Sequence, residues 1–143
     1  MRRATIAVLA LAVIGLTVTG IAAAHFQRYP TTVTIKLKGT KGKSGKAANT
    51  FDGKVNSALP RCQKGRTVLV SRDGALVGQT VSDSTGSWQL GLGGQAAPAG
   101  NYTATALKKV YRRHRPGHPR HKHVCKKGVS KALSVKGTYT AKR

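Results

Sequence analysis

The sequence is poorest in acidic side chains. Among its 143 residues there are three aspartates, Asp52, Asp73 and Asp83, and no glutamate. This scarcity argues against reactions that need two or three converging carboxylates, such as most glycoside hydrolysis and aspartic proteolysis. No nucleophile-elbow motif is present, and Asp73 and Asp83 fall in expected turns, so a Ser-His-Asp site is not indicated. We therefore expect no enzymatic activity and no cofactor.

Cysteines and aromatic residues are also few. Aromatic side chains make up 5% of the chain and all hydrophobic residues 39%, which is enough for a globular fold with a modest core. The only cysteines are Cys62 and Cys125. In an exported chain an even count favours an intramolecular disulfide, and one that closes so long a loop stabilises by about 4 kcal/mol. A metal thiolate site and an intermolecular bridge are the alternatives.

The N-terminal region has the three-part pattern of a secretory signal. Met1-Arg2-Arg3 is a basic start, an apolar run follows from Ile6 to Val18, and Ala22-Ala23-Ala24 supplies the small side chains of a cleavage site. We expect a signal helix in residues 1–24, with cleavage after Ala24, and a secreted or cell-surface protein. The uncharged stretch from Ala4 to Ala24 is also long enough to span a bilayer, so an uncleaved membrane anchor is the alternative.

Beyond this signal, short runs of alternating apolar and polar residues predict strands. The first is 31–38, where Val33, Ile35 and Leu37 share one face. Residues 39–48 are rich in glycine and lysine and predict a flexible basic loop. We thus expect an N-terminal strand and loop over residues 25–50. Further strands are expected at 51–56, 66–72, 75–81, 87–92, 101–110 and 125–135.

Turn signals separate these expected strands. Asp73-Gly74 is a strong signal for a two-residue hairpin, and residues 83–86 predict a second turn. No run beyond the signal shows helical spacing. We therefore expect an all-β fold: a single antiparallel β-sandwich of about seven strands, Ig-like or transthyretin-like, over residues 51–136, followed by a tail of residues 137–143.

Several short motifs follow one another along the expected sandwich. They are a Gly-x-Val strand, an Arg-x-Val-x-Val strand, a glycine turn, a Thr-x-x-Asp-x-x-Gly-x-Trp turn and a Gly-x-Tyr-x-Ala strand. Their residues are Gly53, Val55, Arg66, Val68, Val70, Gly74, Thr80, Asp83, Gly86, Trp88, Gly100, Tyr102 and Ala104.

On these motifs, residues 51–135 resemble the carboxypeptidase regulatory-like, transthyretin-like sandwich. The chain is also similar to a group of small, basic, exported bacterial proteins that have one cysteine before a Gly-Arg-x-Val strand and a second near the last strand. The resemblance implies the sandwich fold and a structural or adhesive role.

The most unusual segment is 108–127, which we expect to form a long protruding loop between two strands. It holds nine lysines and arginines, and the chain as a whole has a net charge of +23. Such a loop attracts polyanions, which outside the cell are wall polymers, anionic lipids or nucleic acid. No recognition helix or stacking platform is expected, so we expect no sequence-specific nucleic-acid recognition. The predicted polyanion-binding residues are Lys108, Lys109, Arg112, Arg113, Arg115, Arg120, Lys122, Lys126 and Lys127.

Histidines in the same segment permit a third interpretation. His118, His121 and His123 are spaced closely enough to share a metal ion, and neutral imidazole suits Zn, Cu or Ni. The surrounding cations oppose a metal ion, and no carboxylate lies nearby to orient the rings. The leading hypothesis is an exported, non-enzymatic protein with a structural or interaction role, whose partner is an anionic polymer or another surface protein. Polyanion binding through 108–127 is the alternative, and metal binding is the third.

Overall fold

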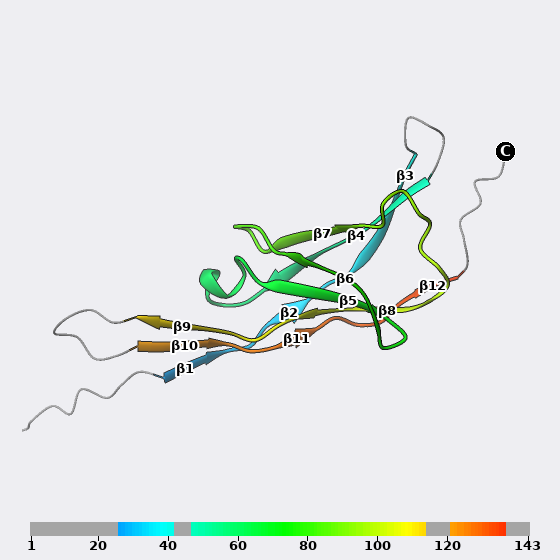
Figure 1. Ribbon diagram of the computed structural model, residues 1–143. Helices are drawn as coiled ribbons and strands as arrows, with labels where there is room; N and C mark the ends of the chain where they lie inside the picture. Colours follow the sequence, from blue (N-terminus) through cyan, green and yellow to red (C-terminus); the bar gives the residue numbers. More distant parts are fainter. Residues whose placement is uncertain (1–25, 42–46, 114–120, 137–143) are drawn as a thin grey trace, which may run out of the picture.

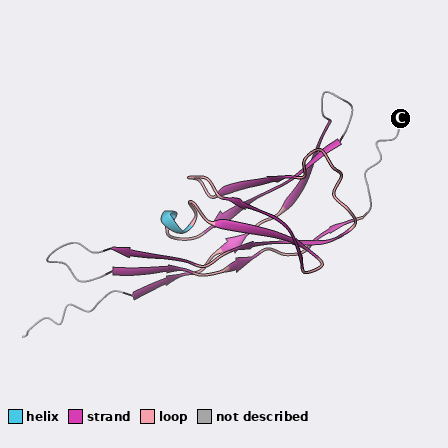
Figure 2. Ribbon diagram, in the orientation of Figure 1, coloured by secondary structure: helices cyan, strands magenta, loops and turns pink. Residues whose placement is uncertain are grey.

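The computed structural model describes residues 26–41, 47–113 and 121–136, which are almost entirely β-structure. The predictions for the signal peptide and for the C-terminal tail fall outside the described residues. The one helical element described is a 3-10 turn, η1 (Pro60–Cys62), shown in cyan in Figure 2. The strands are β1 (Phe26–Tyr29), β2 (Thr32–Val33), β3 (Lys36–Lys41), β4 (Ala47–Asn56), β5 (Thr67–Arg72), β6 (Ala75–Val81), β7 (Ser87–Gly91), β8 (Gly100–Ala106), β9 (Lys109–Arg113), β10 (His121–Cys125), β11 (Gly128–Val129) and β12 (Leu133–Val135).

Two antiparallel sheets form a sandwich (Figure 1). In one sheet, β8 lies between β5 and the short strands β11 and β12, and β6 forms the far edge. In the other sheet β4 is central, with β2 and β3 along one edge and β7 along the other. The expectation of an all-β, sandwich-like fold is confirmed.

A small set of side chains fills the space between the two sheets. Phe51 on β4 and Tyr102 on β8 are 0% and 1% exposed, and their rings lie 4.6 Å apart between centroids. Val68 and Val70 on β5 are fully buried, and Trp88 on β7 is 2% exposed. The apolar residues of these alternating strands therefore face one common core, as the sequence pattern predicted.

Gly53 has a packing function that explains its place in the Gly-x-Val motif. A Cβ atom at this position would lie 1.9 Å from the carbonyl oxygen of Thr34 and 2.6 Å from the Trp88 ring. Thr34 lies between β2 and β3, and its amide donates to the Lys54 carbonyl oxygen at 2.9 Å. Any side chain at residue 53 would therefore push the edge strand off β4.

Both predicted turns are present. Arg72 and Ala75 pair across Asp73-Gly74, and both turn residues have positive φ (49° and 88°), as a type I′ hairpin requires. In the second turn, Asp83 Oδ1 accepts hydrogen bonds from the backbone and hydroxyl of Thr85 and from the amide of Ser87. These hydrogen bonds, those from Thr85 first, hold the pKa of Asp83 below its ordinary value.

The N-terminal segment differs from the expectation in two ways. β3 extends to Lys41 and β4 begins at Ala47, so much of the predicted loop at 39–48 is paired strand. Because β2 and β3 both pair with β4, residues 32–33 and 36–41 form an edge of the sandwich rather than a preceding region. Ladder hydrogen bonds are made by the backbone, so a glycine- and lysine-rich segment can form them where a neighbouring strand is available.

A third sheet extends from one end of the sandwich (Figure 1). Its central strand β10 pairs antiparallel with β9 and parallel with β1. We call these three strands the arm. The expectation of a long loop over 108–127 is wrong, because β9 and β10 are paired strands, and only 114–120 lies outside the described residues.

Candidate functional site

Three strands that belong to the sandwich continue into the arm, and each is interrupted on the way. The interruptions are residues 30–31 between β1 and β2, residues 107–108 between β8 and β9, and residues 126–127 between β10 and β11. An interrupted ladder leaves backbone carbonyl groups without their strand partners. The junction of sandwich and arm therefore needs hydrogen-bond donors from elsewhere.

Arg66, whose side chain is fully buried, supplies those donors. Its Nε and Nη2 donate to the Leu107 carbonyl oxygen at 3.0 and 2.6 Å, and Nη2 also donates to that of Lys126 at 2.9 Å. Its Nη1 donates to the Cys62 carbonyl oxygen at 2.6 Å and to Thr31 Oγ1 at 3.2 Å. One guanidinium thus links all three interruptions.

The charge of Arg66 is buried among neutral acceptors. Burial lowers the pKa of this guanidinium from its ordinary value, and the nearby Tyr111 acts in the opposite direction with a smaller effect. An arginine nevertheless stays protonated in proteins, so the five N–H donors remain in place. The arginine of the Arg-x-Val-x-Val motif therefore holds the arm on the sandwich.

A disulfide reinforces the same junction. Cys62 in η1 and Cys125 at the end of β10 are bonded, with their Cα atoms 5.3 Å apart, and both are fully buried. This pairing was predicted from the sequence. The bridge ties the central strand of the arm to η1, and closing a loop of this length stabilises the fold by about 4 kcal/mol on the chain-entropy model.

One face of the arm packs against the segment around η1. It carries Cys125, and the strand partners alternate so that Tyr111 and Lys109 lie on the same face. The Tyr111 hydroxyl donates to the Arg61 carbonyl oxygen at 2.6 Å, and Lys109 Nζ donates to that of Gly65 at 2.6 Å. We call this the inner face. Its contacts fix the arm and engage one of the predicted polyanion-binding lysines within the fold.

The opposite face, which we call the outer face, carries cations around exposed apolar side chains. Phe26, Lys122 and Arg112 stand side by side on β1, β10 and β9. The Arg28 guanidinium carbon lies 5.0 Å from the centroid of the Phe26 ring, and Lys122 Nζ lies 5.2 Å from it. Phe26 is 48% exposed and Val110 40% exposed, and the three cations are exposed as well.

The carboxylates of the chain lie away from the arm. Asp52 is on β4, where Lys38 Nζ approaches its Oδ2 at 3.0 Å. Asp73 accepts a hydrogen bond from the Asn101 amide at 3.0 Å in the β5–β6 hairpin, and Asp83 caps its own turn. Since the sequence has no other acidic side chain, none is left to neutralise the cations of the arm.

The structure separates the predicted polyanion-binding residues into groups. Arg115 and Arg120 lie outside the described residues. The outer face gains a cation that sequence reasoning missed, Arg28, because residues before Thr31 were not expected to join the basic segment. The signal that could have found it is the period-two spacing of Phe26 and Arg28. The remaining predicted residues are Lys109, Arg112, Arg113 and Lys122 on the arm strands, and Lys108, Lys126 and Lys127 at the junction.

Two of the three predicted metal-binding histidines lie on β10. The rings of His121 and His123 are stacked with centroids 6.5 Å apart, and the Tyr29 ring lies 5.7 Å from His123. His118 lies outside the described residues. Within residues 26–41, 47–113 and 121–136, no three histidine, cysteine or acidic side chains come together as metal ligands.

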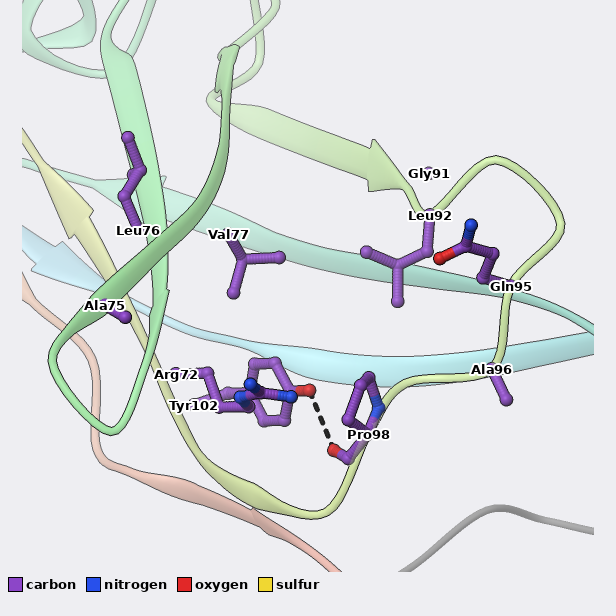
Figure 3. Close-up of a pocket in the computed structure, with 10 residues that line it drawn as sticks. All are labelled: Arg72, Ala75, Leu76, Val77, Gly91, Leu92, Gln95, Ala96, Pro98 and Tyr102. Carbon is purple, nitrogen blue, oxygen red and sulfur yellow. Dashed lines mark hydrogen bonds between the residues drawn. The ribbon is translucent and has the colours of Figure 1, made fainter.

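An open cleft of about 470 Å³ lies beside the β5–β6 hairpin, away from the arm (Figure 3). Tyr102 forms part of its wall, and the Tyr102 hydroxyl donates to the Pro98 carbonyl oxygen at 2.8 Å. Arg72 is the one charged residue among those that line it, beside apolar residues such as Val77 and Leu92. Without a carboxylate, histidine or cysteine, this lining offers no general base and no metal ligand set.

Comparison with known proteins gives no relative. No protein-family model matches the chain, and neither the curated proteins nor the solved structures contain a significant match. Within the described residues, no helix has both the length and the apolar character needed to cross a membrane. Fold and site together thus define a β-sandwich with a cross-linked, basic arm.

Proposed function

We propose that this chain is an exported, non-enzymatic interaction module that contacts anionic partners through the outer face of the arm. The observation that carries this proposal is the outer face itself. Arg28, Arg112 and Lys122 are exposed there, and every acidic side chain of the protein lies in the sandwich. Because no acidic side chain of the protein lies beside these cations, they are free to interact favourably with an external anion.

Export is supported by two independent features. The bonded pair Cys62 and Cys125 is compatible with an oxidising compartment outside the cytoplasm. The N-terminal residues 1–24 have the sequence pattern of a secretory signal. An extracellular partner of negative charge is therefore the class of partner to test.

The geometry favours binding to a run of negative charges rather than to one small anion. Neighbouring strands of a sheet lie about 5 Å apart, so Arg112 on β9 and Lys122 on β10 are spaced to meet successive charges of a polymer or a charged surface. On the outer face Phe26 is the one aromatic ring among the described residues, and the described strands of the arm include no recognition helix, so binding is expected to be independent of base sequence.

The test uses random-sequence duplex DNA as a probe polyanion. A variant with Arg28→Gln, Arg112→Gln and Lys122→Gln removes three phosphate contacts from the outer face. The logarithm of the binding constant falls linearly with the logarithm of the salt concentration. If each lost contact no longer releases counterions, the slope of this line becomes shallower by roughly 2.7. Affinity is measured by fluorescence anisotropy at several salt concentrations.

The matched control changes the same net charge elsewhere. Lys36→Gln, Lys54→Gln and Lys131→Gln also remove three exposed lysines, all from the sandwich. This control is expected to keep most of the salt slope of the unchanged protein. Equal losses in the two variants would mean that diffuse net charge binds the polymer, and the proposed function would be rejected.

A further inference from the structure

We propose that the outer face of the arm docks on a bilayer surface rich in anionic phospholipid headgroups. This inference rests on the proposed function, because it names the anionic partner of the same surface. It differs from polymer binding in one respect: it assigns a role to the exposed apolar side chains as well as to the cations.

The outer face combines the two residue classes that meet at a membrane–water interface. Phe26 and Val110 expose 48% and 40% of their surface, although burial elsewhere in the fold would be favourable for both. Arg28, Arg112 and Lys122 surround them. A soluble polyanion requires only the cations, whereas a bilayer also accepts the apolar groups at the boundary of headgroups and acyl chains.

The positions of the cations relative to Phe26 fit this interpretation. The Arg28 guanidinium and the Lys122 ammonium both lie near the ring, at 5.0 and 5.2 Å from its centroid. They would reach lipid phosphates while the ring reaches slightly deeper. A nucleic-acid base that stacked on the ring would instead have to compete with these cations for its faces. The arrangement therefore favours a lipid surface over single-stranded nucleic acid.

The order of the sequence brings the arm near a membrane. The uncharged run predicted to enter the bilayer during export ends at Ala24, and only His25 separates it from β1. At no more than about 3.6 Å per residue, this connection is too short to place β1 far from the membrane surface while the run is inserted. Until cleavage after Ala24, this short connection would therefore hold the strand that carries Phe26 and Arg28 beside the membrane.

The experiment measures sedimentation of the exported protein with vesicles. One vesicle population mixes phosphatidylglycerol and phosphatidylcholine in equal parts, and the other contains phosphatidylcholine alone. We expect binding to the mixed vesicles and none to the neutral ones. Phe26→Ala should weaken binding to mixed vesicles roughly tenfold, since a buried phenylalanine contributes strongly to transfer. The same variant keeps every cation of the outer face and should weaken binding to heparin far less than binding to the vesicles.

Two further variants serve as controls. Leu76→Ala removes an apolar side chain that is 64% exposed on β6, away from the arm, and should bind the vesicles as the unchanged protein does. Phe26→Trp should retain binding, and the emission of the new indole should shift to the blue when it enters the interface of the mixed vesicles. Trp88 is buried, so its own emission should change little on binding.

The outcomes separate this inference from the proposed function. Binding to heparin without binding to mixed vesicles overturns the inference and leaves the proposed function standing. Equal vesicle affinity of Phe26→Ala and the unchanged protein also overturns it. Single-stranded DNA is measured as a third probe, and a loss of affinity in Phe26→Ala confined to this probe would overturn the inference and identify a nucleic-acid surface. Binding to neither heparin nor vesicles would reject both proposals.

Discussion

At the scale of single residues, Arg66 determines whether the arm and the sandwich form one body. Its guanidinium donates to the carbonyl groups of Leu107 and Lys126 and to the hydroxyl of Thr31 at the strand interruptions, and to the carbonyl group of Cys62 in η1. Burying a charge is costly unless its hydrogen bonds are complete, and here the fork of donors completes them. Arg66, which belongs to a strand motif in the sequence, thus stabilises the junction between the sandwich and the arm.

Arg66→Lys tests this role with the charge retained. A lysine offers its donors from one point and cannot reach Leu107, Lys126 and Cys62 together, so buried carbonyl groups lose their partners. We expect the free energy of unfolding in urea to fall by about 3 kcal/mol. Arg61→Lys, at an exposed position, is the control and should change stability by less than about 0.5 kcal/mol. A small effect of Arg66→Lys would contradict the role assigned to its fork.

Sequence reasoning succeeded at residues whose chemistry is local. The Asp73-Gly74 hairpin followed from residues that accept positive φ, and the cysteine pair followed from its count and setting. The role of Arg66 could not be predicted. Its acceptors belong to residues 31, 62, 107 and 126, which only the tertiary fold brings together.

At the scale of elements, most of the sandwich strands were predictable, except at residues 39–41 and 47–50, and the arm strands were not. β7 alternates between polar and apolar residues, and β6 directly follows the Asp73-Gly74 hairpin signal, so the bounds of both strands were close to those expected. β9 carries cations on both faces, and β10 alternates histidines with a lysine, so the period of two is concealed within an apparent charge run. Pairing of β1 with β10 joins segments far apart in sequence, for which no local pattern exists.

The disulfide provides a prediction about these elements. In a Cys62→Ala/Cys125→Ala variant, we expect the free energy of unfolding to fall by about 4 kcal/mol, because the unfolded chain regains the entropy of a long loop. Amide hydrogen exchange should rise most in β9 and β10, since the bridge fixes β10 to η1. Urea unfolding and exchange measured by mass spectrometry check the two parts.

A uniform rise in exchange across the sandwich and the arm would show that the bridge stabilises the molecule only globally. Unchanged exchange in β10 would contradict its role as a clamp on the arm. Reduction of the unchanged protein with a thiol reagent should reproduce the behaviour of the double variant, which controls for the loss of the cysteine side chains themselves.

At the scale of the whole molecule, charge is distributed unequally between the two parts. The formal net charge is +23, and all three aspartates lie in the sandwich. Repulsion among the cations of the arm opposes its formation, so the fold supplies Arg66, the disulfide and the inner-face hydrogen bonds to hold it in place. The anionic partner that we propose would offset this repulsion.

The most direct test of that claim is a titration of the isotopically labelled protein with a short heparin oligosaccharide, followed by amide chemical shifts in NMR spectra. We expect the largest shift changes in β1, β9 and β10, at residues 26–29, 109–113 and 121–125, and we expect them to diminish as salt is added. Changes spread evenly over all exposed lysines, or centred on the β6–β7 edge of the sandwich, would contradict it.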